Sequence, residues 1–227
     1  MEIEDINKLG RELIDILKLK TSPVAVSLIP NTHDIPEGID RRKQPTRHCQ
    51  MIDDVRRNGS QYYTLMEDHA CKGGAAVMGF HEMEPNLANG DVYFNLNSFS
   101  TINAARRTMQ KIPMLPAGYT KAILYAPIAS AKFMPDVVVI VCNPKQVMQL
   151  SQALLHRLGG RVDANFAGKQ SLCADGVAQP YKTGQIGVTV GCSGSRKNTN
   201  IEDDEMVIGI PLERLHDMVE AAKVMFT

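Results

Sequence analysis

Five cysteines are the side chains of this 227-residue chain best suited to bind a metal or attack a substrate. They lie at positions 49, 71, 142, 173 and 192. No two of them form a Cys-x-x-Cys pair, so the spacings of zinc ribbons, thioredoxins and ferredoxins are absent. Any site that uses several of them must be assembled by the fold from distant segments. The odd count also argues against complete pairing in disulfides.

The sequence around Cys142 differs from that around the other four. Cys142 ends the apolar run VVVIVC, which is typical of a buried strand, so we interpret it as a small core residue. The other four lie where a predicted loop meets a helix or strand, and three of them have a glycine within three residues. Glycine lets the backbone approach a bulky ligand closely. The candidate metal ligands are therefore Cys49, Cys71, Cys173 and Cys192.

Four thiolates suit either an iron–sulfur cluster, with a four-iron cluster favoured, or zinc as the alternative metal. The other interpretation is four unrelated thiols that are mostly buried. His48 and His69 lie next to two of the cysteines and would join a metal shell, although such histidines more often bond locally. The sequence contains no nucleophile elbow, P-loop or G-x-G-x-x-G motif.

The stretch VGCSGSRK places basic residues and glycines around Cys192. A guanidinium stabilises a thiolate and binds carboxylate or phosphate, so Arg47 and Arg196 are candidate cofactor-binding residues. The alternative for each is a solvated surface cation. Gly191 and Gly194 are candidates because they allow a packed, ligand-facing loop. Replacement of Gly194 by valine is expected to disturb the site more than replacement of Ser195 by alanine.

Hydrophobic periodicity predicts both helices and strands. Helices are expected at 4–20, 49–58, 100–112, 143–159 and 211–225. Strands are expected at 23–29, 61–66, 121–128, 136–142, 186–190 and 206–210. The mixture lacks strict βαβ alternation, which favours an α+β fold with a mixed β-sheet and packed helices. No linker divides the chain, so residues 1–227 are expected to form a single compact domain.

Composition excludes several classes of protein. The 25 basic and 25 acidic residues cancel, which argues against general nucleic-acid binding. The apolar runs are too short to span a bilayer, and the acidic, amphipathic N-terminus is not a secretory signal. We therefore expect a cytoplasmic protein that does not bind membranes.

Several stretches resemble an uncharacterised prokaryotic family that is frequent in methanogens and other anaerobes. They are LKTSPVAVSL, RHCQ, ACKGGAAVMGF, PDVVVIVCNPKQVMQL, SLCADGVAQPYKTG, VGCSGSRKNTNIEDDEMVIGIP and the closing helix. The resemblance covers nearly the whole length and implies one domain of this family. Its pattern includes cysteines that match the four candidates and an arginine that matches Arg196. Anaerobic hosts favour iron–sulfur chemistry.

The leading hypothesis is a protein that binds an iron–sulfur cluster for electron transfer, cluster handling or redox support of a larger anaerobic enzyme. Its partner would be a redox protein or a small anion, and the oligomeric state stays open. The alternative is a cysteine-dependent enzyme acting on a small anionic substrate. Its nucleophile would be Cys192 or Cys49, activated by Arg196 or by His48. A third reading is an interaction protein without a cofactor.

Overall fold

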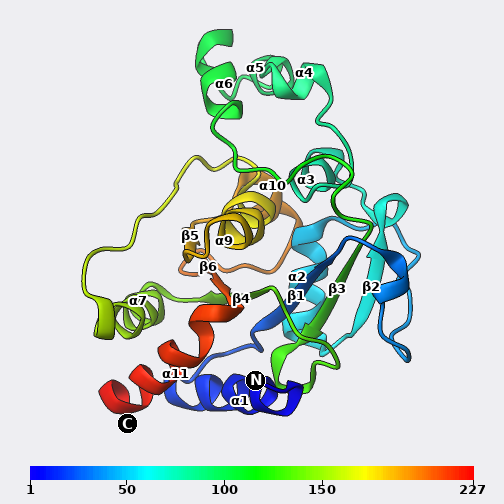
Figure 1. The fold of residues 1–227 in the computed structure, drawn as a ribbon. Coiled ribbons are helices and arrows are strands. Elements are labelled where there is room, and N and C mark those ends of the chain that lie inside the picture. The colour runs from blue at the N-terminus through cyan, green and yellow to red at the C-terminus, as the bar shows by residue number, and fades with distance from the viewer.

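Six strands form one sheet in the computed structural model, which describes residues 1–227 (Figure 1). The order across the sheet is β2-β3-β1-β4-β6-β5, and every pairing between neighbouring strands is antiparallel. The strands are β1 (Val24–Ile29), β2 (Tyr62–Leu65), β3 (Ala122–Pro127), β4 (Val137–Cys142), β5 (Gly187–Thr189) and β6 (Met206–Pro211).

The antiparallel pairing corrects the expectation of a mixed sheet, whereas the α+β class is confirmed. Parallel pairing occurs only in two isolated bridges, Arg41–Tyr63 and Thr46–His69. The irregular order of helices and strands favoured a sheet with both parallel and antiparallel pairs. Instead, each connection places the next strand antiparallel to its neighbour in the sheet. For example, β3 and β4 lie on either side of β1, and both run antiparallel to it.

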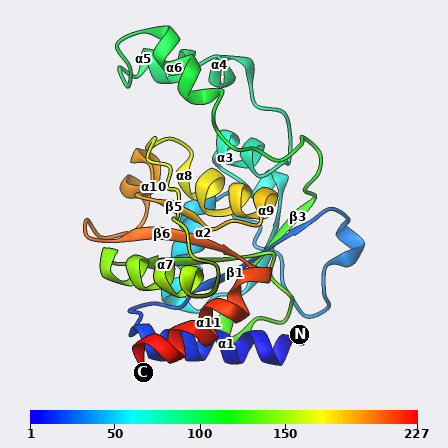
Figure 2. The same ribbon diagram turned by 60° about the vertical axis from the view of Figure 1, so that its left-hand side comes forward.

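Helices cover both faces of the sheet (Figures 1 and 2). One face packs against α1 (Ile3–Leu17), α7 (Pro144–Leu158) and α11 (Leu212–Phe226). The other carries α2 (His48–Asn58), α3 (Lys72–Val77) and a helical stretch made of α8 (Ser171–Cys173), η4 (Ala174–Ala178) and α9 (Gln179–Thr183). No helix is long and apolar enough to cross a bilayer. The remaining short helices outside the 85–109 region are η1 (Thr32–Asp34), η2 (Met66–Asp68), η3 (Ile128–Ser130) and α10 (Ser193–Asn198).

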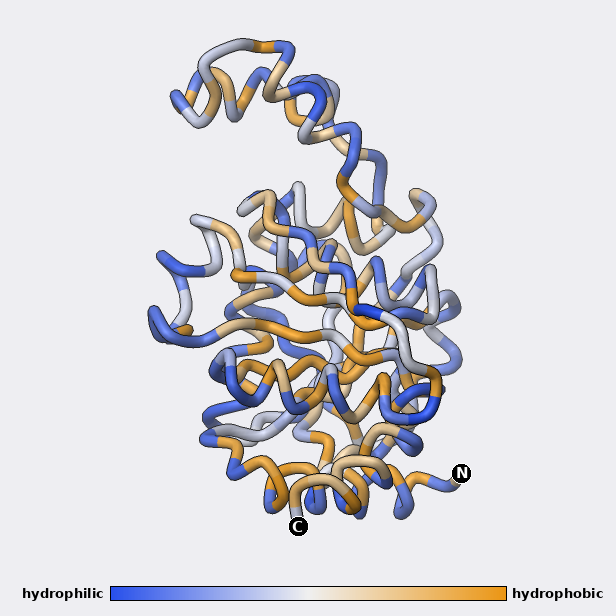
Figure 3. The backbone as a smooth tube through the Cα atoms, turned by 90° about the vertical axis from the view of Figure 1, so that its left-hand side faces the viewer, coloured by the Kyte–Doolittle hydropathy of each residue, from blue (hydrophilic) through white to orange (hydrophobic).

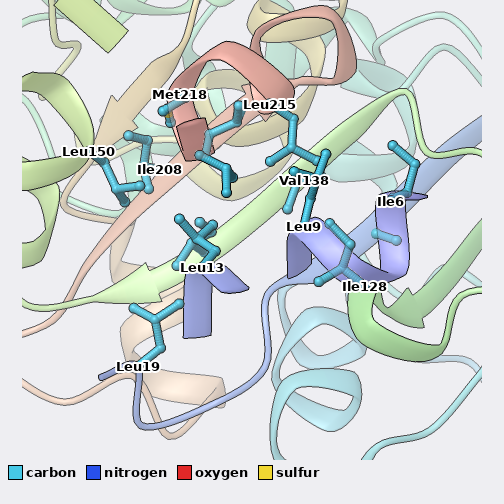
Figure 4. Close-up of a cluster of buried hydrophobic side chains, with 14 of the residues drawn as sticks. Ile6, Leu9, Leu13, Leu19, Ile128, Val138, Leu150, Ile208, Leu215 and Met218 are labelled. Carbon is cyan, nitrogen blue, oxygen red and sulfur yellow. The ribbon is translucent and has the colours of Figure 1, made fainter. Parts of the chain in front are cut away.

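Alternating side chains of the strands separate two cores. Along β4, Val138, Ile140 and Cys142 point to the face of α1, α7 and α11, whereas Val137, Val139 and Val141 point to the opposite face. Figure 4 shows the first core, where Leu13 of α1 packs near Ile208 of β6 and Leu215 of α11. Cys142 is buried here, which confirms its interpretation as a core residue.

Three short helices form an arm that projects away from the layers (Figures 1 and 3). They are α4 (Pro85–Ala88), α5 (Asp91–Asn95) and α6 (Ile102–Met109). Only the last was predicted, as part of 100–112. The helices pack closely together at Gly90, which has a φ of 86°. A Cβ on Gly90 would lie only 2.7 Å from the carbonyl carbon of Ala105.

A close backbone contact fixes the 171–183 helical stretch on the sheet. Its central turn, η4, is a π-helix. A Cβ on Gly209 of β6 would lie only 2.0 Å from the Gly176 carbonyl oxygen, and one on Gly187 of β5 would lie 1.8 Å from the Asp175 carbonyl oxygen. The helix can rest directly on these strands because they carry no side chain at the contact. This contact sets the height at which Cys173 stands above the sheet.

Replacement of Gly209 by alanine is therefore expected to destabilise the protein by about 1–3 kcal/mol, because the added methyl must push the π-turn off the sheet. The matched control is Gly176→Ala on the other side of the same contact. Its Cβ would meet Val207 Cγ1 at 3.7 Å, an ordinary van der Waals distance. Urea unfolding compares the two variants, and equal midpoints would contradict this account of the contact.

Candidate functional site

Four cysteines from four distant segments line one small pocket on the sheet face that carries α2 and α3. The pocket has a volume of about 50 Å³. It contains Cys49 from α2, Cys71 before α3, Cys173 from α8 and Cys192 before α10. The structure thus brings together the four candidate ligands and leaves Cys142 on the opposite face of the sheet.

Cys71 and Cys192 stand at equivalent places, each as the residue that precedes a helix. The sulfur of Cys71 accepts the backbone N–H of Gly74 at 3.3 Å, and that of Cys192 accepts the N–H of Ser195 at 3.3 Å. The first amides of a helix have no carbonyl partner within the helix, so a sulfur can take that role. Both sulfurs therefore already receive an amide of the kind that stabilises a thiolate.

The segment after Cys192 is a helix rather than the predicted loop. The Ser195 hydroxyl oxygen accepts the Cys192 N–H at 2.9 Å, which closes a reciprocal cap around the first turn of α10. Ser195 is fully buried. The glycine spacing predicted a larger role for Gly194 than for Ser195, but a Cβ on Gly194 would meet only the Cys192 sulfur, at 3.7 Å.

Cys49 and Cys173 lie within the first turns of their helices and are held as neutral thiols. Burial, followed by the neighbouring Cys192 and Cys71, raises the pKa of Cys49 to about 12. Burial also raises the pKa of Cys173 well above its usual range, with added contributions from the other three cysteines. The Cys173 thiol donates to the Gln170 carbonyl oxygen at 3.1 Å. The four thiols are close enough to disfavour one another's ionisation.

The two candidate arginines occupy different places. Arg47 lines the pocket, and its positive charge favours the Cys49 thiolate, although less than burial opposes it. Arg196 does not line the pocket. Its guanidinium donates to the carbonyl oxygens of Val190 and Glu205 at 2.7 and 2.6 Å, and also to that of Glu202. The expectation that Arg196 faces the thiolates is therefore corrected: it fastens the chain before and after α10.

The two candidate glycines near Cys192 also differ. Gly194 lines the pocket. Gly191 does not, but its φ of 83° and the 2.9 Å separation between its Cβ position and Ser195 Oγ leave no room for a side chain. Gly191 therefore shapes the entry to α10 instead of contacting a ligand.

One of the two candidate histidines belongs to the pocket. His48 is buried in its lining. Its Nδ1 lies 2.8 Å from the Tyr125 hydroxyl, and its Nε2 has no hydrogen-bond partner. His69 does not line the pocket and bonds locally, with Nε2 at 3.0 Å from Thr64 Oγ1. Burial lowers the pKa of His48 to about 3 and that of His69 to about 4, so both are neutral near pH 7.

Gln170 is a pocket residue that the sequence did not single out. It is buried, has a φ of 53°, and its Nε2 donates to the Tyr93 hydroxyl at 3.0 Å. No spacing or composition marks it, because its role depends on a left-handed backbone conformation and on α5, which was not predicted. No three or more His, Cys, Asp or Glu side chains in the structure meet the geometry of a bound metal ion.

The chain belongs to the family of uncharacterised ArCR proteins, DUF169, whose model matches residues 12–221. It is also similar to the uncharacterized protein MJ0308 of Methanocaldococcus jannaschii. The two are 38% identical over 222 residues, which cover 97% of this chain and 95% of that protein. No solved structure matches the chain. The resemblance to an uncharacterised family found in methanogens is thereby confirmed.

Acid is expected to destabilise the metal-free protein through the two buried histidines. Their folded pKa values lie below the ordinary value of 6.5, so below that pH the unfolded chain binds protons that the folded chain does not. Stability should fall as the pH falls from about 6.5 towards 4, by up to about 1.4 kcal/mol per pH unit for each histidine. Urea unfolding across this range should show a shallower slope for His69→Gln. The exposed His156→Gln is the control, and equal slopes for all three proteins would refute the assignment.

Replacement of Ser195 by alanine is expected to cost about 1 kcal/mol of stability, because it removes the reciprocal cap that holds Cys192. Gly194→Ala is the matched control, since the structure has room for its methyl group and alanine favours a helix. Thermal and urea unfolding of both variants test the difference. If Gly194→Ala is the more damaging change, the cap made by Ser195 is unimportant for stability.

Proposed function

We propose that the pocket binds an iron–sulfur cluster, or another metal, through Cys49, Cys71, Cys173 and Cys192. A four-iron cluster is the favoured type, and zinc is the alternative metal. The observation that carries the proposal is the gathering of four thiols from four distant segments in one pocket, while the fifth lies across the sheet. Unrelated buried thiols would have no reason to share one location.

The surroundings of the thiols support this proposal. Cysteine binds metals as the thiolate, so a bound metal would replace the protons that burial and mutual repulsion keep on Cys49 and Cys173. The amides of Gly74 and Ser195 already point at two of the sulfurs. Hydrogen bonds of this kind tune the potential of a cluster. Because the side chains do not form a finished metal geometry, loading would have to turn the sulfurs inward.

An activated nucleophile, the alternative, lacks the activating groups that it requires. A reactive cysteine has a lowered pKa, whereas the pKa of Cys49 is raised. His48 bonds to Tyr125, and Arg196 is occupied by backbone carbonyls. A thiol enzyme would therefore require Cys192 to act as the nucleophile without help from His48 or Arg196.

The proposed role is electron transfer, cluster handling or redox support of a larger enzyme in the cytoplasm of an anaerobe. Cys49, Cys71 and Cys192 are each partly accessible, which leaves one side of the pocket open to a redox protein or small molecule. The similar protein of a methanogen agrees with an anaerobic setting. Solvent access and amide hydrogen bonds together would set the potential of a cluster there.

The experiment that tests the proposal is to prepare the protein without oxygen and measure its iron, zinc and acid-labile sulfide contents. We expect a brown protein with iron and sulfide in equal amounts. Cys71→Ser and Cys173→Ser should each lose most of this metal, because one ligand of four is missing. Zinc without sulfide would identify the alternative metal.

The matched control is Cys142→Ala, which removes a thiol from the other face of the sheet. It should lower stability modestly and keep the full metal content, because Cys142 is distant from the pocket. Equal metal loss in Cys142→Ala and Cys71→Ser would refute the four-ligand assignment. A colourless protein with one cysteine that alkylates far faster than the others would support the thiol-enzyme alternative.

A further inference from the structure

A second cavity, of about 310 Å³, adjoins the cysteine pocket. The two share five lining residues, which are Arg47, Cys71, Gln170, Cys192 and Gly194. The outer wall comes from the arm, through Tyr93 and Leu96, and from the segment before α8, through Lys169. Its volume lies within the range of small-molecule sites, at about 300–1,000 Å³.

The charges that line this cavity are all positive. Arg47 and Lys169 contribute two cations, and no aspartate or glutamate lines the wall. Neither cation forms a salt bridge with any carboxylate of the chain. Two uncompensated cations facing one cavity attract an anion, and the planar guanidinium of Arg47 suits carboxylate or phosphate.

Aromatic rings rather than carboxylates hold Lys169 in place. Its ammonium lies 4.9 Å from the ring centre of Tyr93 and 5.7 Å from that of Phe99. Such contacts position a cation while leaving its charge available to a ligand. Tyr93 is fixed in turn by the hydrogen bond from buried Gln170. Because the arm supplies both rings, the arm completes this side of the cavity.

We propose that this cavity binds a small organic anion, a carboxylate or a phosphate, between Arg47 and Lys169 and beside the cysteine pocket. The apolar side chain of Leu96 and the ring of Tyr93 would contact the carbon skeleton of the ligand. The arm, which projects from the sheet layers, thereby gains a function as one wall of a ligand site (Figure 1).

The inference rests on the proposed function in one respect, because Cys71 and Cys192, which line both cavities, would be metal ligands. An anion held here would lie next to the metal centre, as a substrate or as a ligand that modulates it. The anion site itself requires only the two cations and the cavity, so the two proposals fail in different ways. A protein without iron can still bind an anion, and a protein with iron can fail to bind one.

Calorimetric titration with succinate and with inorganic phosphate tests the site, on metal-free and on iron-loaded protein. Succinamide is the uncharged control ligand. We expect at least one anion to bind with a Kd of about 1 mM or tighter. Which anion binds more tightly distinguishes a carboxylate from a phosphate site. Lys169→Gln should weaken that binding about tenfold, a loss of about 1.4 kcal/mol, with iron content unchanged.

The control variant is Lys145→Gln, which removes an exposed lysine from α7 on the other face of the sheet. It should bind the anion as the unaltered protein does. The anion site is refuted if neither anion binds more tightly than succinamide, or if Lys169→Gln binds as tightly as Lys145→Gln. Absence of both iron and zinc from the protein, together with retained anion binding, would refute the metal centre alone.

Discussion

Crowding of four thiols into one largely buried pocket is the constraint on which the rest of the site depends. Burial opposes the ionisation of Cys49 and Cys173, and each neighbouring thiolate opposes it further. Four buried thiols are stable either when they keep their protons or when a bound cation replaces those protons. Because Arg196 turns away to backbone carbonyls, Arg47 is the only cationic side chain in the pocket wall. A bound metal would supply the missing positive charge.

The fold meets this constraint by bringing first turns of helices to one place. Cys71 and Cys192 precede α3 and α10, whose amides reach the sulfurs. Cys173 belongs to a helical stretch whose π-turn rests on two glycines of the sheet, so its position above the sheet is fixed by backbone contact. The sheet itself separates Cys142 from the others, since alternate residues of β4 face opposite cores.

Local pattern was enough to predict the main elements and the division of the cysteines. The apolar run of β4 marked Cys142 as core, and the junctions between loop and helix marked the other four. Three features depended on how the folded chain arranges its backbone and were not predicted. The antiparallel pairing depends on where each connection returns the chain to the sheet. Arg196 donates to backbone carbonyl oxygens that only the folded chain brings near it. The roles of Gln170 and Tyr93 required α4 and α5 of the arm, which have only four and five residues and are too short to show a helical repeat.

The central claim is that four cysteines hold one metal centre, and X-ray absorption at the iron edge tests it most directly. The sample is the full chain, prepared and kept without oxygen. The account predicts iron surrounded by sulfur at about 2.3 Å, together with iron–iron scattering from a cluster. Iron bound only by oxygen or nitrogen, or the absence of both iron and zinc from the protein, would contradict it.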